Sequence, residues 1–165
     1  MENDEQVLIL TLRMDKSSQE FFDTLRTRHF PAERNFLKAH LTLFHKLPDS
    51  PEIIEQLSAL SISPFKLNVT GLINLGAGVA FRMEAQELKV LRAQLASAFS
   101  ADLSAQDKQG FRGHVTIQNK ITPELARALL AELSDTFKSF EVEAIGLDLW
   151  YYLGGPWAHK QFFPF

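Results

Sequence analysis

Two short segments of the sequence share one pattern, and they constrain the fold more than any other feature. Segments 40–43 (His-Leu-Thr-Leu) and 114–117 (His-Val-Thr-Ile) each alternate a polar residue with an aliphatic one. This alternation is typical of a strand with one buried face. Residues at positions i and i+2 of a strand lie on the same face. The sequence therefore predicts two matched strands, each presenting an imidazole and a hydroxyl.

The residues around the motifs extend the match. Lys38 and Arg112 each lie two residues before the histidine, so a regular strand places a cation on the same face. A single His-x-Thr motif is weak evidence, because a histidine on a strand is more often structural than catalytic. The duplication, with matched aliphatic spacers and a matched cation, favours a functional pair. The candidate catalytic residues are His40, Thr42, His114 and Thr116.

The motifs belong to a longer internal repeat. His114 follows His40 by 74 residues, and Gly146 follows Gly71 by 75. Both halves read as strand, helix, strand, helix and strand, and we expect a pseudo-twofold axis between them. We expect one two-lobed domain over residues 1–165, with repeat halves at about 5–76 and 77–153 and a tail at 154–165 that has no counterpart in the first half.

Several elements can be bounded within this repeat. Gly71 and Gly146 are candidate β-bulge positions, and the polar segment 100–109 reads as a loop. The expected strands are 7–14, 39–47, 65–75, 79–83, 113–121 and 140–152.

Composition and charge exclude several classes of protein. The chain has no cysteine, so disulfides and thiolate chemistry are excluded. The net charge of −3 gives no sign of a broad phosphate-binding surface, so a nucleic-acid ligand should be a nucleotide or an RNA terminus. The acidic residues 1–5 are unlike a signal peptide, and no apolar run is long enough to span a membrane. We expect a soluble cytoplasmic monomer without a membrane partner.

Two imidazoles suit acid–base chemistry at phosphorus. Histidine titrates near neutral pH, so one ring can be neutral while another is protonated. Such a pair can serve a phosphodiester as base and acid, whether the two strands lie side by side or face each other across a cleft. The threonine hydroxyls can donate to non-bridging oxygens, and Lys38 and Arg112 can add positive charge.

The same reading predicts no metal or other cofactor. The sequence has no His-Glu-x-x-His motif and no carboxylate cluster beside either histidine. Trp150, Tyr152 and Trp157 can stack on a nucleobase, although strand aromatics in a chain with 14 phenylalanines are more often core residues.

The paired His-Leu-Thr-Leu and His-Val-Thr-Ile motifs resemble the two-histidine (2H) phosphoesterase superfamily. Its members include bacterial 2′-5′ RNA ligase-like proteins and 2′,3′-cyclic nucleotide phosphodiesterases. The resemblance implies an α+β fold with two mostly antiparallel sheets around a central cleft and helices outside. It also implies metal-independent cleavage, or reversible ligation, of 2′-linked phosphates.

The resemblance carries over to individual residues only at the motifs. It places the function on His40, Thr42, His114 and Thr116, with His40 as base and His114 as acid in ring opening. Phe44 and His45 follow the first motif, where ligase-like members often have an arginine. The particular substrate therefore stays open.

Two other hypotheses compete with an enzyme. The chain can be a nucleotide- or RNA-end-binding module that has kept the pocket without turnover. Retention of both histidines and both threonines disfavours this, because arginine would bind phosphate as well. The chain can also be a repeat-built interaction domain, which requires His40 and His114 to be buried and remote from each other.

Overall fold

The computed structural model describes residues 5–165, so residues 1–4 of the acidic N-terminal segment lie outside the described part of the chain. The strands are β1 (Val7–Met14), β2 (Leu41–Pro48), β3 (Phe65–Asn74), β4 (Val79–Glu84), β5 (His114–Gln118), β6 (Phe140–Tyr152) and β7 (Trp157–Pro164). The helices are α1 (Lys16–His29), the short 3-10 helix η1 (Ala32–Arg34), α2 (Pro51–Ser58), α3 (Gln86–Ala98), α4 (Ala105–Lys108) and α5 (Pro123–Thr136).

All seven strands form one antiparallel sheet, which corrects the prediction of two sheets. The order is β2-β1-β6-β3-β4-β5, and β7 pairs with β6. One edge of β6 pairs with β1, while its other edge pairs first with β3, over residues 140–144, and then with β7, over residues 146–152. The 13-residue β6 is thus long enough to run through both parts of the sheet and join them.

The pairing of the strands is symmetric about the middle of the β3–β6 ladder. Leu67 pairs with Val142 there, and the ladder extends two residue pairs to either side, ending at Phe65–Ala144 and Val69–Phe140. A register shift lies between Val69 and Gly71 where β3 pairs with β4, and an equivalent one lies between Ala144 and Gly146 where β6 pairs with β1. Bulges of this kind increase the local twist and bend of a strand. They occur at the two glycines where the sequence predicted them.

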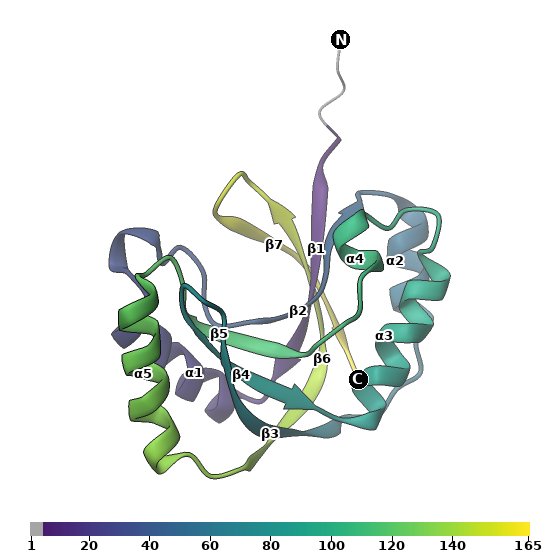
Figure 1. The fold of residues 1–165 in the computed structure, drawn as a ribbon. Coiled ribbons are helices and arrows are strands. Elements are labelled where there is room, and N and C mark those ends of the chain that lie inside the picture. The colour runs from purple at the N-terminus through teal and green to yellow at the C-terminus, as the bar shows by residue number, and fades with distance from the viewer. Residues whose placement is uncertain (1–4) are drawn as a thin grey trace.

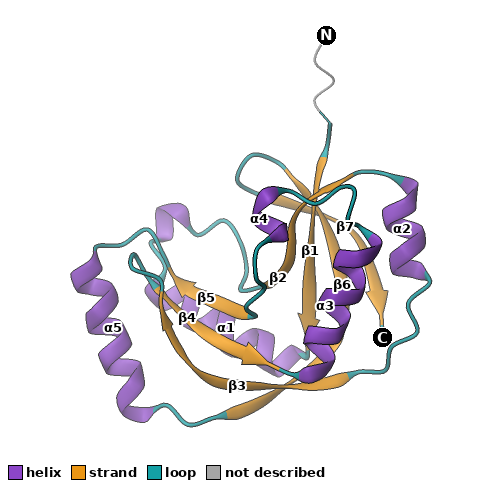
Figure 2. Ribbon diagram, turned by 45° about the vertical axis from the view of Figure 1, so that its right-hand side comes forward, coloured by secondary structure: helices purple, strands orange, loops and turns teal. Residues whose placement is uncertain are grey.

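The helices flank the curled sheet in two groups, as Figure 1 and the turned view in Figure 2 show: α1 and α5 on one side, and α2, α3 and α4 on the other. Helix α5 contacts β3 and β4, whereas α1, from the first half of the sequence, contacts β5 in the second half. Helix α4 contacts β2. The predicted loop at 100–109 thus contains a one-turn helix, which is too short to give a periodic signal.

Aromatic contacts explain why α1 and α3 cross to the other half. Phe22 of α1 packs edge-on against Phe81 of β4, with ring centroids 5.4 Å apart. Phe99, which follows α3, packs against Phe44 of β2 at 5.7 Å. Phe22, Phe44 and Phe99 are at most 2% exposed, and burial of such rings is a large favourable term in folding. Within residues 5–165, no helix is long and apolar enough to cross a membrane.

The equivalent glycines give a matched pair of stability variants. A Cβ on Gly146 would lie 2.4 Å from Phe162 Cε2 and 2.6 Å from the Phe163 carbonyl oxygen. We expect Gly146→Ala to lower the free energy of unfolding by about 1–3 kcal/mol through overpacking, measured by urea denaturation.

Gly71→Ala is the control for this variant. Its Cβ would meet only Arg82 Nη1, at an ordinary 3.6 Å, so its loss of stability should be well below that of Gly146→Ala. Equal losses at the two positions would mean that the close approach of β7 to Gly146 is not the cause.

Candidate active site

The two motif strands alternate as predicted. Leu41, Leu43, Val115 and Ile117 are at most 1% exposed and form part of the core. On the opposite face, His40, Thr42, His114 and Thr116 are all partly exposed. The register places Thr42 opposite Thr11 of β1, and His114 opposite Arg82 of β4.

The two imidazoles are held in the same way. His40 Nδ1 lies 2.8 Å from the Lys38 carbonyl oxygen, and His114 Nδ1 lies 2.8 Å from the Arg112 carbonyl oxygen. A carbonyl only accepts, so each Nδ1 donates, and the Nε2 of a neutral ring then carries the free lone pair. Lys38 and Arg112 thus serve the site through their backbone, while both residues remain exposed beside it.

Two buried arginines, which sequence reasoning missed, connect the motif strands to helices. Arg26 of α1 donates from Nη1 to the Thr116 carbonyl at 3.0 Å and from Nε to Asn35 Oδ1 at 2.9 Å. Arg92 of α3 donates from Nε to the Leu43 carbonyl at 2.8 Å. A signal was available, because each arginine lies four residues after an apolar residue, on the buried face of its helix.

The sheet brings the two histidine strands together. Strands β2 and β5 contact each other, although they stand at opposite ends of the strand order. The positive charge of His114 also contributes to lowering the pKa of His40. This contradicts the interaction-domain hypothesis, which requires the histidines to be remote from each other.

The pKa of His40 is lowered to about 4. Burial is the main cause, because it disfavours the charged form. The hydrogen bond to the Lys38 carbonyl opposes the shift, whereas the charges of Arg26, His114 and His45 add to it. His40 is therefore neutral at physiological pH, with the lone pair on Nε2.

Strand β7, formed by the tail, brings an aromatic group to His40. The Trp157 ring lies 4.6 Å from the His40 ring, centroid to centroid, and 6.0 Å from Trp150. Trp150 donates from Nε1 to Thr11 Oγ1 at 2.9 Å, so it lies on the same face as Thr42. Tyr152 lies at the end of β6, opposite Trp157 and 44% exposed.

A polar group lies beside these aromatics. Asp148, only 5% exposed, accepts hydrogen bonds from Arg13 Nε at 2.8 Å and Arg13 Nη2 at 2.6 Å. It also accepts from His159 Nε2 at 2.7 Å. The guanidinium of Arg13 lies over the Phe162 ring, 3.5 Å from its centroid. Within residues 5–165, the first repeat half has no counterpart of β7, so this arrangement is found only on the His40 side.

His45, which follows the first motif, contacts a buried carboxylate. The buried carboxylate of Asp107 accepts from the backbone N–H groups of His45 and Lys46, at 2.9–3.0 Å, and lies 3.1 Å from His45 Nδ1. This network fixes α4 against β2. Within residues 5–165, no group of three or more metal-ligating side chains is present.

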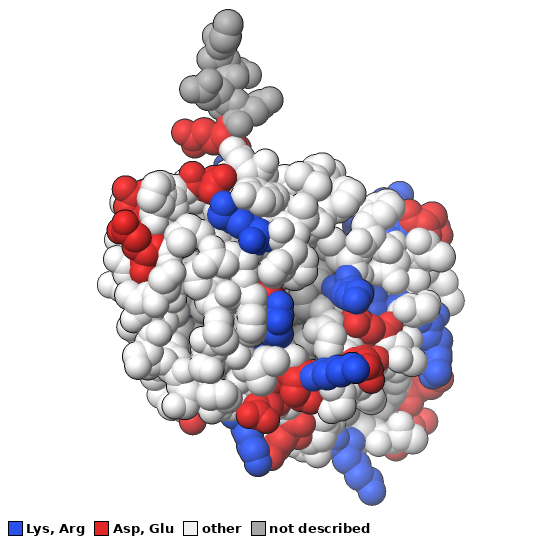
Figure 3. Space-filling view, turned by 180° about the vertical axis from the view of Figure 1, so that it is seen from behind, with Lys and Arg blue, Asp and Glu red and all other residues white. Residues whose placement is uncertain are grey.

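Charged residues do not gather into one basic surface on the face shown in Figure 3, where Lys and Arg lie among Asp and Glu.

The side chains described above can hold a small anionic group between two imidazoles. The imidazole of His40 is neutral, with a free lone pair on Nε2. The hydroxyls of Thr42 and Thr116 lie on the same strand faces as the histidines, and aromatic rings lie on the His40 side.

Comparisons with solved structures show proteins of similar fold. The chain resembles E. coli LigT in complex with 3′-AMP, at 17% identity and a TM-score of 0.63, covering 98% of each chain. It also resembles TT0787 of Thermus thermophilus, at 16% identity and a TM-score of 0.65, covering 96% of this chain and 97% of the other. Usb1 of Kluyveromyces marxianus gives 13% identity and a TM-score of 0.50, with 97% of each chain covered.

A sequence search among curated proteins gives no significant match. The profile of the 2′-5′ RNA ligase superfamily, in contrast, matches residues 14–156, a range that includes both histidine motifs and strands β2 to β6. The chain is therefore a member of the 2′-5′ RNA ligase superfamily, within the two-histidine phosphoesterases.

Proposed function

We propose that this protein is a phosphodiesterase that cleaves 2′,3′-cyclic or 2′-5′ phosphodiesters, at an RNA end or in a small nucleotide, by acid–base catalysis between His40 and His114. One observation carries the proposal: both imidazoles are held through Nδ1 by the carbonyl two residues earlier, on strands that contact each other. This leaves two Nε2 atoms for proton transfer. Family membership supports the choice of 2′-linked phosphates.

The division of roles follows from burial. His40 is neutral at neutral pH and takes a proton from the attacking water at Nε2. His114, in its protonated form, donates its Nε2 proton to the leaving ribose oxygen as the P–O bond breaks. The product is a phosphomonoester. In the reverse, ligation-like direction the two roles exchange. His114 takes the proton of the ribose hydroxyl that attacks phosphorus, and His40 protonates the oxygen that departs as water, so that a new P–O bond joins the two ends.

Other residues bind and orient the substrate. Thr42 and Thr116 donate to the non-bridging oxygens as charge develops at phosphorus. The side chains of Lys38 and Arg112 supply positive charge beside the motifs, and Trp150, Trp157 and Tyr152 offer aromatic faces for a nucleobase. The similar E. coli LigT forms a complex with 3′-AMP, which supports a nucleotide as the ligand. Both proton transfers use protein groups, so the reaction needs no cofactor.

The first test removes each imidazole. We expect His40→Ala and His114→Ala to lower kcat/KM for a 2′,3′-cyclic nucleotide by roughly 10²–10⁴-fold each, the usual contribution of a general acid or base. The fold should persist by circular dichroism. His29→Ala, at the end of α1, is the control and should keep full activity; near-wild-type turnover in either motif variant would contradict the two-histidine mechanism.

A phosphodiester with an aryl leaving group too good to need protonation assigns the roles. It should restore turnover to His114→Ala but not to His40→Ala. Restoration of the opposite variant would exchange the roles of base and acid. Turnover by neither variant would mean that both histidines chiefly bind phosphate. If the wild type binds nucleotides without turnover, the chain is a binding module.

The lowered pKa of His40 predicts an unusual pH profile. The base must be neutral, and it becomes protonated only as the pH falls through about 4. Activity should therefore persist well below pH 6.5, where an unperturbed histidine base would already be protonated. The acidic limb of kcat/KM and an NMR titration of His40 should agree. If the acidic limb of kcat/KM lies at pH 6.5 and the NMR titration assigns it to His40, burial does not determine the pKa of His40.

Metal removal tests the chemistry in another way. Exhaustive chelation with EDTA should leave kcat/KM unchanged, because both proton transfers are made by imidazoles. Inactivation by EDTA, with recovery on addition of Zn²⁺ or Mn²⁺, would identify the histidines as metal ligands instead.

A further inference from the structure

Arg13 and Arg82 occupy equivalent positions in the two halves, one beside each histidine strand. Arg13 of β1 pairs with Gly146, and Arg82 of β4 pairs with Gly71, each at the bulge described above. Arg82 also lies directly opposite His114 on β5. Opposed residues of an antiparallel pair share a face, so the Arg82 side chain starts on the face that carries His114.

The surroundings of the two arginines differ in charge. Arg13 is neutralised by Asp148, with hydrogen bonds of 2.8 and 2.6 Å. The residue at the position of Asp148 in the other half is Ile73, 75 residues earlier. Among the residues from 5 onward, Arg82 makes no ion pair or side-chain hydrogen bond, and it is exposed. The His114 side therefore carries an uncompensated cation.

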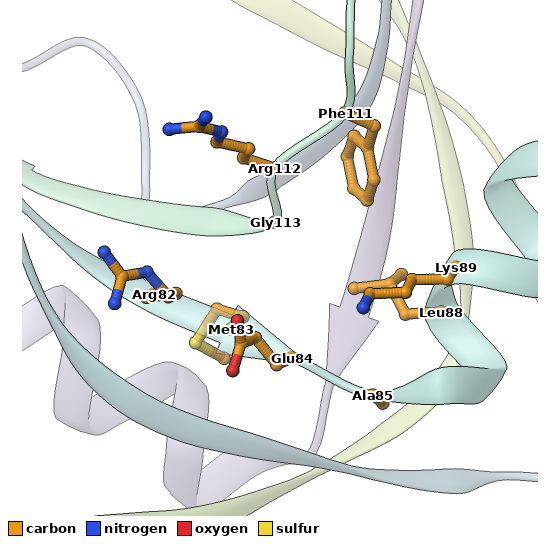
Figure 4. Close-up of a pocket in the computed structure, with 9 residues that line it drawn as sticks. All are labelled: Arg82, Met83, Glu84, Ala85, Leu88, Lys89, Phe111, Arg112 and Gly113. Carbon is orange, nitrogen blue, oxygen red and sulfur yellow. The ribbon is translucent and has the colours of Figure 1, made fainter.

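Arg82 lines a pocket of about 400 Å³ that adjoins the second motif. Two further cations line it, Lys89 from α3 and Arg112 from the segment before β5, against one carboxylate, Glu84. Figure 4 shows the guanidinium groups of Arg82 and Arg112 extending on the same side, with the Phe111 ring turned into the pocket. We call the site lined by Arg82, Lys89 and Arg112 the basic pocket.

We propose that the basic pocket binds a second phosphate of the substrate, the one attached to the 5′ side of the reacting nucleotide. This inference rests on the proposed function, which places the reacting phosphate between the two imidazoles. The pocket begins at Arg82 and Arg112, next to His114, and extends away from the reacting position toward α3. Arginine binds phosphate through paired, charge-assisted hydrogen bonds, and three cations against one anion favour a phosphate over a neutral sugar or base.

The two sides of the site thus divide the nucleotide between them. Aromatic rings from β6 and β7 lie on the His40 side, and free cations lie on the His114 side. A nucleotide oriented with its base toward Trp157 and its 5′-phosphate toward Arg82 satisfies both. The inferred substrate class is a nucleotide with a 5′-phosphate, either free or continuing into an RNA chain.

Binding measurements test this without turnover. By calorimetry, the wild type should bind adenosine 3′,5′-bisphosphate at least about tenfold more tightly than adenosine 3′-monophosphate, the gain expected of a charge-assisted hydrogen bond. Arg82→Gln should bring this ratio close to one. Ile73→Asp should do the same, because it places a carboxylate beside Arg82 as Asp148 stands beside Arg13. Ile73→Asn is the neutral control and should keep the wild-type ratio.

Turnover distinguishes the two sources of the phosphate. The ratio of kcat/KM for substrates with and without a 5′-phosphate should fall in Arg82→Gln. Comparison of a 5′-phosphorylated 2′,3′-cyclic mononucleotide with a dinucleotide ending in a 2′,3′-cyclic phosphate shows whether a monoester or a diester is preferred.

Several outcomes would overturn the inference. Equal binding of the two adenosine nucleotides by the wild type would do so, as would an unchanged ratio in Arg82→Gln. Equal weakening of both ligands in Arg82→Gln would place Arg82 on the reacting phosphate instead. Selective binding without any hydrolysis would contradict the proposed function and leave the basic pocket standing.

Discussion

Two buried arginines hold the motif strands in place, and the geometry of the site depends on them. Strands β2 and β5 end the strand order, so carbonyl groups on their outer sides lack a neighbouring strand. Arg26 and Arg92 supply donors to these carbonyls and thereby satisfy their own buried guanidinium groups. Burial lowers the pKa of Arg26 to about 10, which still leaves it charged at neutral pH. Each arginine comes from the other repeat half, so neither half anchors its histidine strand alone.

The sequence allowed the strands and their faces to be predicted, but not how they pair. Alternation is local, so the buried and exposed faces of β2 and β5, and the span of β6, could be read directly from the residues. Pairing partners are not local, and nothing in the periodicity of β6 says that one edge serves both β3 and β7. The expectation of two sheets failed for that reason. Strand β7 also escaped prediction, because its glycine- and proline-containing approach gives no repeat signal.

The electrostatics of the site required three-dimensional information. The two histidines could be identified from their duplication, whereas the cause of the lowered pKa of His40 could not, because the cations beside the motifs, Lys38 and Arg112, are exposed. Burial is the main cause instead, with Arg26 the first of the charges. The hydrogen bonds that fix both rings come from backbone carbonyls, which any residue supplies. The side chains of Lys38 and Arg112, which supply these carbonyls, therefore give no indication of this role in the sequence.

The passage of β6 through both parts of the sheet has a mechanical consequence. Two lobes joined by a linker can close over a ligand, whereas two lobes sharing a hydrogen-bonded strand can separate only by breaking backbone pairs. The spacing of the two imidazoles is therefore set before any ligand arrives. Such preorganisation reduces the entropy lost on reaching the transition state, and it removes domain opening as a step that could limit product release.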